Sequence, residues 1–350
     1  MNAQEQTTPL PTSARAEAAT GYFARLARWN VYEILFWLAL AGMYFVPNVD
    51  LVLMSQVFIW GLFAMSLDIL LGYRGIPSLG HAAFFGVGAY VAGYCGKFGW
   101  TEPISALVLA MAIAAVVGWL TGKLVQRVTG VGLLMVTLGL NLILYDLVHR
   151  STDVTGGDDG MQGIVIAPVL GLFRFDIYGR TAFWYALIMA FILFVVARAV
   201  VKSPFGLALL GARENPRRMI MLGAPVEGDV SRAFALAAAL AGAAGALLTQ
   251  TTQFVSPATL SFQRSADVLV ILIIGGTGRL YGGFIGALVF LILRDWLAAI
   301  SPVYWYFWIG LLLVVVVSFF RKGLLPSIEA LLNRWKPPKA GGPSQGAPPV

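Results

Sequence analysis

The amino-acid sequence predicts an all-α protein, a polytopic transmembrane helical bundle of about ten spans, some short or broken, with both termini cytoplasmic. Three observations support this fold class. Of the 350 residues, 59% are apolar and only 12% are charged, which leaves too little polar surface to cover a water-soluble core. The apolar residues form successive runs separated by short polar segments. The 24 basic residues lie mostly in those segments, as topology signals do, and not on a face that could bind nucleic acid. We therefore expect membrane lipid around the protein and no nucleic-acid partner.

The predicted elements follow in chain order. Residues 1–30 are polar and alanine-rich and form an N-terminal cytoplasmic segment, without the small-residue cleavage site of a removable signal peptide. A membrane domain is expected over residues 31–325, followed by a cytoplasmic tail over 326–350 whose Pro-, Gly- and Ser-rich end should be disordered. The predicted spans are 31–46, 51–71, 78–95, 104–121, 131–148, 181–201, 230–250, 266–274, 280–293 and 304–320.

The number and direction of the spans can be tested against length and charge. Several runs are shorter than the ~20 residues that a perpendicular helix needs. The runs 266–274 and 280–293 are separated only by a glycine-rich turn, so they could be half-helices, tilted helices or one broken element. An even number of spans with the amino terminus inside assigns 18 of the 24 basic residues to the inner side and 6 to the outer side. This asymmetry is the one that cytoplasmic loops usually show.

Two polar segments interrupt the spans, an outer loop at 150–180 and an inner loop at 202–229. The outer loop contains Thr155-Gly156-Gly157 followed by Asp158 and Asp159. The two acids could bind a metal ion, but calcium sites need more oxygen ligands at defined spacing. We therefore expect a solvated turn and no metal site.

The inner loop contains a short helix with signals at both ends. Asn215 suits the N-cap, Pro216 the first helical position and Gly223 the left-handed position that ends a helix. Such a helix is too short to be stable alone, and its apolar Met219, Ile220 and Leu222 need a surface. That surface is either the membrane, with the arginines as anchors, or a cytoplasmic protein, and we interpret the helix as a docking element.

Several segments resemble a known family. They occur in the same order as in the branched-chain amino acid ABC-transporter permease family, and the similarity extends from about residue 50 to residue 325. Within the family the chain is most similar to the type with the long outer loop. The first matching segment is SLGHAAFFGVGAY at 78–90. The second runs from TGG at 155–157 to Gly163, and the third from REN at 213–215 to LG at 222–223. The fourth comprises SP at 256–257, SF at 261–262, RSA at 264–266 and GG at 275–276, and GLL at 310–312 and at 323–325 also matches.

The resemblance implies a subunit of an importer in the bacterial inner membrane. Its expected partners are a second, different permease subunit, two cytoplasmic ATPase subunits and a periplasmic substrate-binding protein. The family's ATPase-coupling region corresponds to the docking helix and its flanks. Pro216 and the Arg217/Arg218 pair depart from the common family pattern, which bears on which ATPase is accepted. The implied coupling residues are Arg213, Glu214, Asn215, Arg217, Arg218, Met219, Leu222 and Gly223.

No enzymatic motif is present in the sequence. A phosphate-binding loop needs the pattern GxxxxGK[ST], but the Gly-Lys pairs at 96–97 and 122–123 are followed by Phe98 and Leu124. We expect no catalytic, cofactor-binding or metal-binding residues, because ATP is bound by the partner subunits. The competing class is a secondary transporter or channel driven by an ion gradient, which would use buried acids or histidines. The candidates are Asp68, His81, Asp146 and Asp267, of which the three acids lie near span ends where water or arginine could satisfy them.

The transported solute is expected to be a branched-chain amino acid, with urea, short amides or small carboxylates as alternatives. An amino-acid zwitterion needs a few polar groups or helix ends in a mostly apolar path. Thr137 and Asn141, four residues apart on one helix face, are such groups, unless they only bond neighbouring helices. The candidate substrate-pathway residues are Ser78, His81, Thr137 and Asn141.

Overall fold

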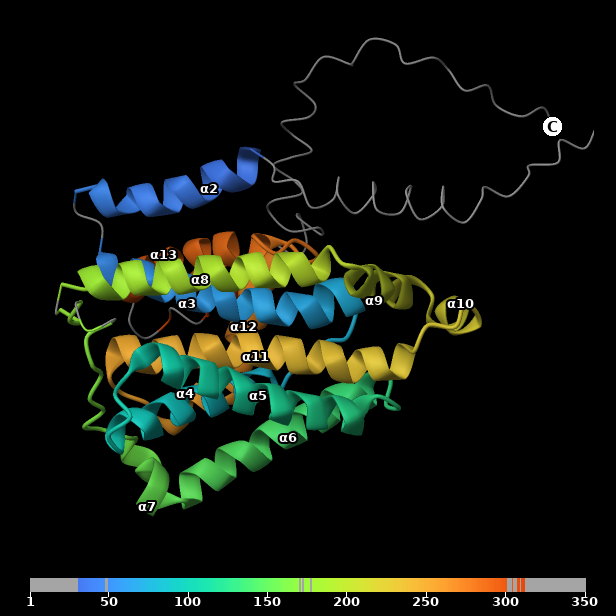
Figure 1. Cartoon of the computed structure of the whole chain (residues 1–350), viewed down its shortest axis with the longest axis horizontal. Helices are drawn as coiled ribbons and strands as arrows, with labels where there is room; N and C mark the ends of the chain where they lie inside the picture. Colours follow the sequence, from blue (N-terminus) through green and yellow to red (C-terminus); the bar gives the residue numbers. More distant parts are fainter. Residues whose placement is uncertain are drawn as a thin grey trace, which may run out of the picture.

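Helices lying side by side along one direction form the structure (Figure 1). The computed structural model describes residues 31–47, 50–169, 171, 173–176, 178–300, 304, 307–308 and 310–311. Within this part of the chain there is no strand, and two isolated bridges pair loop residues, Met161 with Val255 and Val169 with Phe173. The all-α prediction is confirmed.

Long helices and short helical segments follow one another along the chain. They are α2 (Val31–Gly42), η1 (Met43–Phe45), α3 (Leu51–Asp68), η2 (Ile69–Arg74), α4 (His81–Lys97), α5 (Pro103–Val125), α6 (Val131–Arg150), α7 (Thr152–Thr155), η3 (Gly157–Asp159), α8 (Arg180–Val201), α9 (Pro204–Glu214), α10 (Pro216–Met221), α11 (Val226–Thr252), η4 (Pro257–Leu260), α12 (Phe262–Gly275) and α13 (Gly282–Ile300). The segment η2 continues α3 with π-helical geometry.

Length and hydropathy identify membrane-crossing helices. In the described ranges, six helices are long and apolar enough to cross a membrane: α3 with η2, α5, α6, α8, α11 and α13. Helices α2, α4 and α12 also coincide with predicted spans, but α4 has 17 residues and α12 has 14. The predicted number of ten spans is therefore not confirmed. The last predicted span, 304–320, and the segments 1–30 and 326–350 lie largely or wholly outside the described residues.

Small residues permit close packing at the centre of the bundle, where α11 contacts α3, α4 and α5. A Cβ atom on Gly88 of α4 would collide with the backbone of Gly242 in α11, and one on Gly245 would collide with the Phe85 carbonyl. Lipid provides no hydrophobic drive between helices, so such close backbone approach is a main source of helix association.

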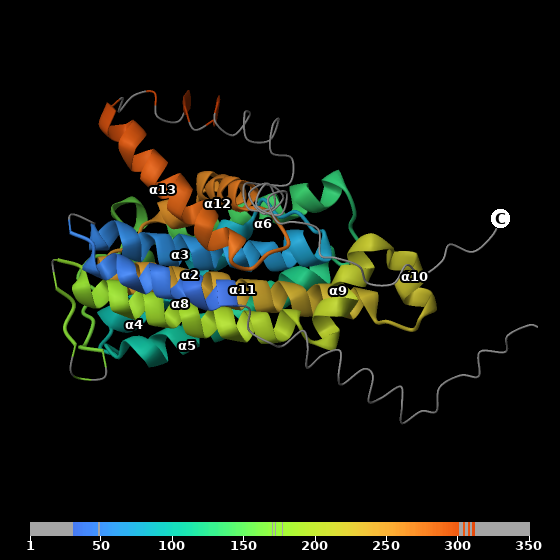
Figure 2. The ribbon, with the colours of Figure 1, turned by 90° about the horizontal axis from the view of Figure 1, so that it is seen from above.

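The two predicted loops lie at opposite ends of the bundle. Figures 1 and 2 show α9 and α10 projecting from one end, and Figure 1 shows α7 at the other. This arrangement is the one expected for loops on opposite sides of a membrane. Near the α9 end, Arg198 of α8 forms an ion pair with Glu33 of α2 at 3.0 Å, which attaches α2 to the bundle.

Helices α4 and α12 begin inside the bundle and not at its ends. His81 is the first residue of α4 and bonds to Ser66 of α3. Ser66 lies roughly 10 Å before Arg74, the residue at which α3 with η2 ends. The segment before α12 contacts Gly86 of α4 through Leu260. At about 21 Å, α12 is shorter than the hydrocarbon core. It is a separate short helix that packs against α13, so the interpretation of one broken element is wrong.

Candidate functional site

A buried polar cluster surrounds the first turn of α4. The Ser66 Oγ and His81 Nε2 atoms are 2.8 Å apart, and the Ser66 hydroxyl donates to the Phe63 carbonyl at 2.6 Å. Because that hydroxyl has a single proton, His81 Nε2–H is the donor of the first bond. The neutral imidazole therefore carries its free lone pair on Nδ1. Both side chains are fully buried.

Helix α6 contributes to the cluster from another side. The Leu79 amide donates to Thr137 Oγ1 at 3.4 Å, and Asn141 Nδ2 donates to the Leu260 carbonyl at 2.9 Å. A side chain on Gly80 would collide with the Thr137 carbonyl. Although much of α6 is exposed, Thr137 and Asn141 are buried where they contact the residues just before α4 and Leu260.

The first turns of α4 and α12 meet in the same region. The Ala82 amide donates to Ser265 Oγ at 2.9 Å, and Ser261 caps α12 by accepting from the Arg264 amide. Helix N-termini carry a partial positive charge, and transporters direct the ends of discontinuous helices at the charged groups of their substrates. The arrangement can thus stabilise an anionic group in an otherwise apolar bundle.

Three atoms of the predicted pathway residues have unused hydrogen-bonding capacity. Within the part of the chain that the structure describes, Ser78 Oγ, His81 Nδ1 and Asn141 Oδ1 are buried without a hydrogen-bond partner. Leaving such groups unpaired costs about 1–3 kcal/mol each, so each favours a ligand or water that bonds to it. The four predicted residues are thus located on or next to one segment, residues 78–82. Ser66 and Ser265 were not among the predicted site residues. A serine in an apolar helix such as Ser66 carries no distinctive signal, whereas Ser265 belongs to the RSA segment that matches the family.

The predicted signals of the inner-loop helix are present in α10. Asn215 Oδ1 accepts from the Arg218 amide at 3.0 Å, Pro216 is the first helical residue, and Gly223 has a φ of 81°. The apolar residues divide between two faces. Met219 packs on Gly211 of α9, whereas Ile220 and Leu222 are 60% and 71% exposed.

An exposed apolar tip is therefore formed by Ile220, Met221 and Leu222. Met221, which was not among the predicted docking residues, is the most exposed of the three at 87%. Glu214, Arg217 and Arg218 are exposed beside it. Arg213 is also exposed, but its Nη1 donates to the Gly72 carbonyl of η2 and so contacts the bundle.

The acids considered for an ion-driven mechanism have local partners. Asp146 pairs with Arg150 at 2.7 Å on an exposed face, and Asp267 accepts from Gln263 at 3.1 Å. Asp68 is fully buried, which contradicts satisfaction by water, whereas the alternative of a neighbouring arginine agrees with the charge of Arg213 that acts on it. The Asp68 Oδ1 atom also accepts from the Gly278 amide at 2.7 Å.

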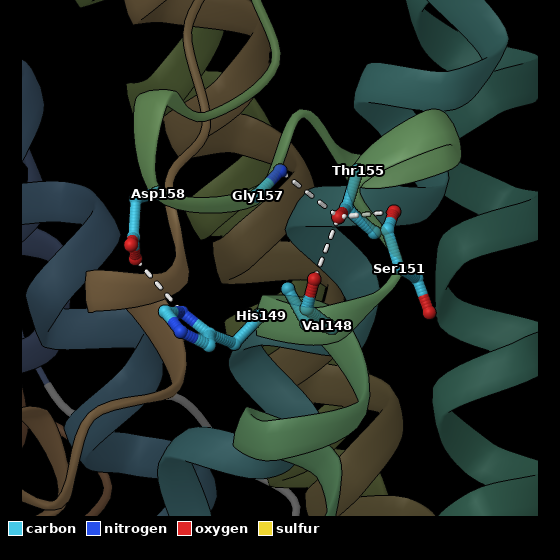
Figure 3. A network of polar contacts seen from close by, with 6 residues as sticks. All are labelled: Val148, His149, Ser151, Thr155, Gly157 and Asp158. Carbon is cyan, nitrogen blue, oxygen red and sulfur yellow. Dashed lines mark hydrogen bonds and ion pairs between the residues drawn. The ribbon is translucent and has the colours of Figure 1, made fainter.

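The outer loop has a defined polar network at its start (Figure 3). The Thr155 hydroxyl lies 2.6 Å from the Val148 carbonyl and 2.8 Å from the Ser151 carbonyl. It also accepts from the Gly157 amide at 3.3 Å. Gly157 and its neighbour Gly156 both have positive φ, which explains the paired glycines after Thr155.

One acid of this loop, Asp158, lies beside a histidine. Asp158 Oδ1 lies 2.8 Å from His149 Nδ1, and both side chains are partly exposed (Figure 3). Across the described ranges, no group of three or more His, Cys, Asp and Glu side chains could hold a metal ion. Further along the loop, Met161 and Ile164 are buried in a small apolar cluster with Val255.

Comparisons with known proteins give a consistent result. Residues 51–317 match the family described as "Branched-chain amino acid transport system / permease component". The chain is similar to the high-affinity branched-chain amino acid transport system permease protein LivM of Salmonella typhimurium and of Escherichia coli. Each is 29% identical over 311 residues, covering 82% of this chain and 72% of the relative.

An archaeal organism provides two further relatives. A probable branched-chain amino acid transport permease protein LivM of Methanocaldococcus jannaschii is 24% identical over 335 residues, covering 80% of this chain and 94% of that protein. A probable LivH from the same organism is 27% identical over 237 residues, covering 64% of this chain and 72% of that protein. No solved structure gives a significant match.

Proposed function

The chain belongs to the family of permease components of branched-chain amino acid transport systems, and we propose that it is the membrane-spanning permease subunit of an ATP-binding-cassette importer. It is a multi-pass membrane protein, and the proposed location is the bacterial inner membrane. The proposed solute is a branched-chain amino acid, as in the names of its relatives.

The polar cluster at the first turns of α4 and α12 carries this proposal. A branched-chain amino acid has an apolar side chain, which suits an apolar path, and two charged groups that need polar partners. The helix ends suit its carboxylate. His81 Nδ1 and Asn141 Oδ1 are unpaired acceptors and suit its ammonium group. The translocation path is proposed to include Ser78, His81, Thr137 and Asn141.

The proposed partners follow from the same family. The similarity to both a LivM and a LivH protein of one organism supports pairing with a second, different permease. Two cytoplasmic ATPase subunits would bind ATP, and a periplasmic binding protein would deliver the solute. The exposed apolar tip of α10 supports docking to an ATPase, because three neighbouring exposed apolar residues favour burial in a protein groove.

The test compares the chain alone with the complete transporter in vesicles. The purified chain should show neither ATP hydrolysis nor uptake driven by an ion gradient. Radiolabelled leucine should accumulate only with both permeases, the ATPase subunits, ATP and the binding protein present. Uptake by the chain alone under a proton gradient, abolished by His81→Ala, would instead establish a secondary transporter.

A further inference from the structure

Two arginine–carbonyl contacts join the end of α9 to η2. Arg213 Nη1 donates to the Gly72 carbonyl, and Arg74 Nη1 donates to the Ala212 carbonyl at 3.3 Å. Each segment therefore supplies one arginine and one carbonyl to the other. Asn215, the cap of α10, is only two residues beyond Arg213, so a displacement of α10 that carries the end of α9 with it must either move η2 or break these bonds.

The Asp68 carboxylate lies next to this junction. Its Oδ1 accepts from the amide of Gly278, a residue of the turn between α12 and α13. A side chain at Gly72 would collide with both the Asp68 carboxylate and the Gly278 backbone. The junction of α3 with η2 is thus bonded on one side to α9 and on another to the α12–α13 turn.

The second oxygen of this carboxylate provides an alternative partner for Arg213. Asp68 Oδ2 is buried and has no hydrogen-bond partner among the described residues, while the Arg279 backbone and, more weakly, the positive charge of Arg213 also act on this carboxylate. A buried carboxylate oxygen without a donor is unfavourable. Movement of α9 that separates Arg213 from the Gly72 carbonyl can place the guanidinium on Oδ2. Two discrete arrangements of one contact are what energetic coupling between distant sites requires.

Two routes lead from this junction to the polar cluster. Along α3, Ser66 precedes Asp68 by two residues and bonds to His81. Along α12, the helix that precedes the Gly278 turn carries Ser265, which bonds to the Ala82 amide. Both routes end at the first turn of α4.

We propose that Arg213 and Asp68 are positioning residues that transmit movement of α9 and α10 to the first turn of α4. Arg213 exchanges its bond to the Gly72 carbonyl for one to Asp68 Oδ2 when an ATPase subunit displaces α10. The proposal rests on the proposed function, because it takes α10 as the ATPase contact.

The test uses the complete transporter in vesicles, with Asp68→Asn, Arg213→Gln and the double variant. Asparagine keeps an acceptor oxygen for the Gly278 amide, but it replaces Oδ2 with an NH2 donor and so removes both the charge and the acceptor proposed for Arg213. Asp68→Asn should assemble and hydrolyse ATP at nearly the wild-type rate, and in Arg213→Gln the loss of import should exceed any loss of hydrolysis. The number of leucine molecules imported per ATP should fall about tenfold, a usual size for coupling between sites. The double variant should lose no more than the worse single variant, because both remove the same contact.

A matched control is Arg150→Gln, at the end of α6, where the exposed arginine pairs with Asp146 at 2.7 Å. It should leave the imported-per-ATP ratio unchanged. If Arg213→Gln does not insert, Arg213→Met, which removes both the charge and the donors, replaces it under the same criteria. The inference would be overturned if the number of leucine molecules imported per ATP did not change, which includes equal losses of hydrolysis and import. It would also be overturned if the defect of the double variant equalled the product of the two single defects. Failure of the proposed function would be visible separately, as wild-type uptake without ATPase subunits.

Discussion

The exposed tip of α10 allows a quantitative prediction for Leu222→Asp. Complete burial of a leucine side chain contributes about 1.5–3 kcal/mol. Because 71% of Leu222 is exposed, docking into an ATPase groove should gain about 1–2 kcal/mol from this side chain. Its loss should weaken ATPase association about 5- to 30-fold, since 1.4 kcal/mol corresponds to a factor of ten. Desolvation of the new carboxylate would increase the effect.

The measurement is the affinity of the ATPase subunits for the reconstituted permease pair, together with leucine uptake. Gly223→Val is a second variant, because a β-branched residue is strained at a φ of 81°, and it should also weaken association. The control is Val154→Asp, an exposed aliphatic position on α7 at the opposite end of the bundle. Wild-type affinity in both α10 variants would refute the reasoning and would mean that α10 rests on the membrane surface.

Two further predictions concern topology and the polar cluster. Single cysteines in residues 155–163 should react with an impermeant reagent from outside, and those in residues 217–223 only from inside. Reaction of both from one side would contradict the predicted topology. Asn141→Leu should leave the Leu260 carbonyl without its donor, at a cost of about 1–3 kcal/mol, and should lower uptake while ATPase association stays normal. Uptake equal to wild type would exclude Asn141 from the path.

Local sequence patterns predicted the positions of most long helices, although α9 was not predicted within the inner loop. An apolar run forms a helix in lipid because every backbone polar group must be satisfied within the segment, so nine of the predicted spans coincide with helices. The cap at Asn215 and the left-handed Gly223 were also predictable, because each depends on a few adjacent residues. The family was recognisable from ordered motifs.

The tertiary structure alone decided which residues meet across the bundle. Asp68 and Gly278 are separated by 210 residues, and Arg213 and Gly72 by 141. Arg213 was expected to belong to the docking region, but its guanidinium contacts η2. Ser265 and Ala82, 183 residues apart, meet because α4 and α12 both begin inside the bundle. Hydrophobic periodicity predicts which residues avoid water. It does not predict how far inside the bundle a helix begins or which other helix it contacts, because packing between helices sets both.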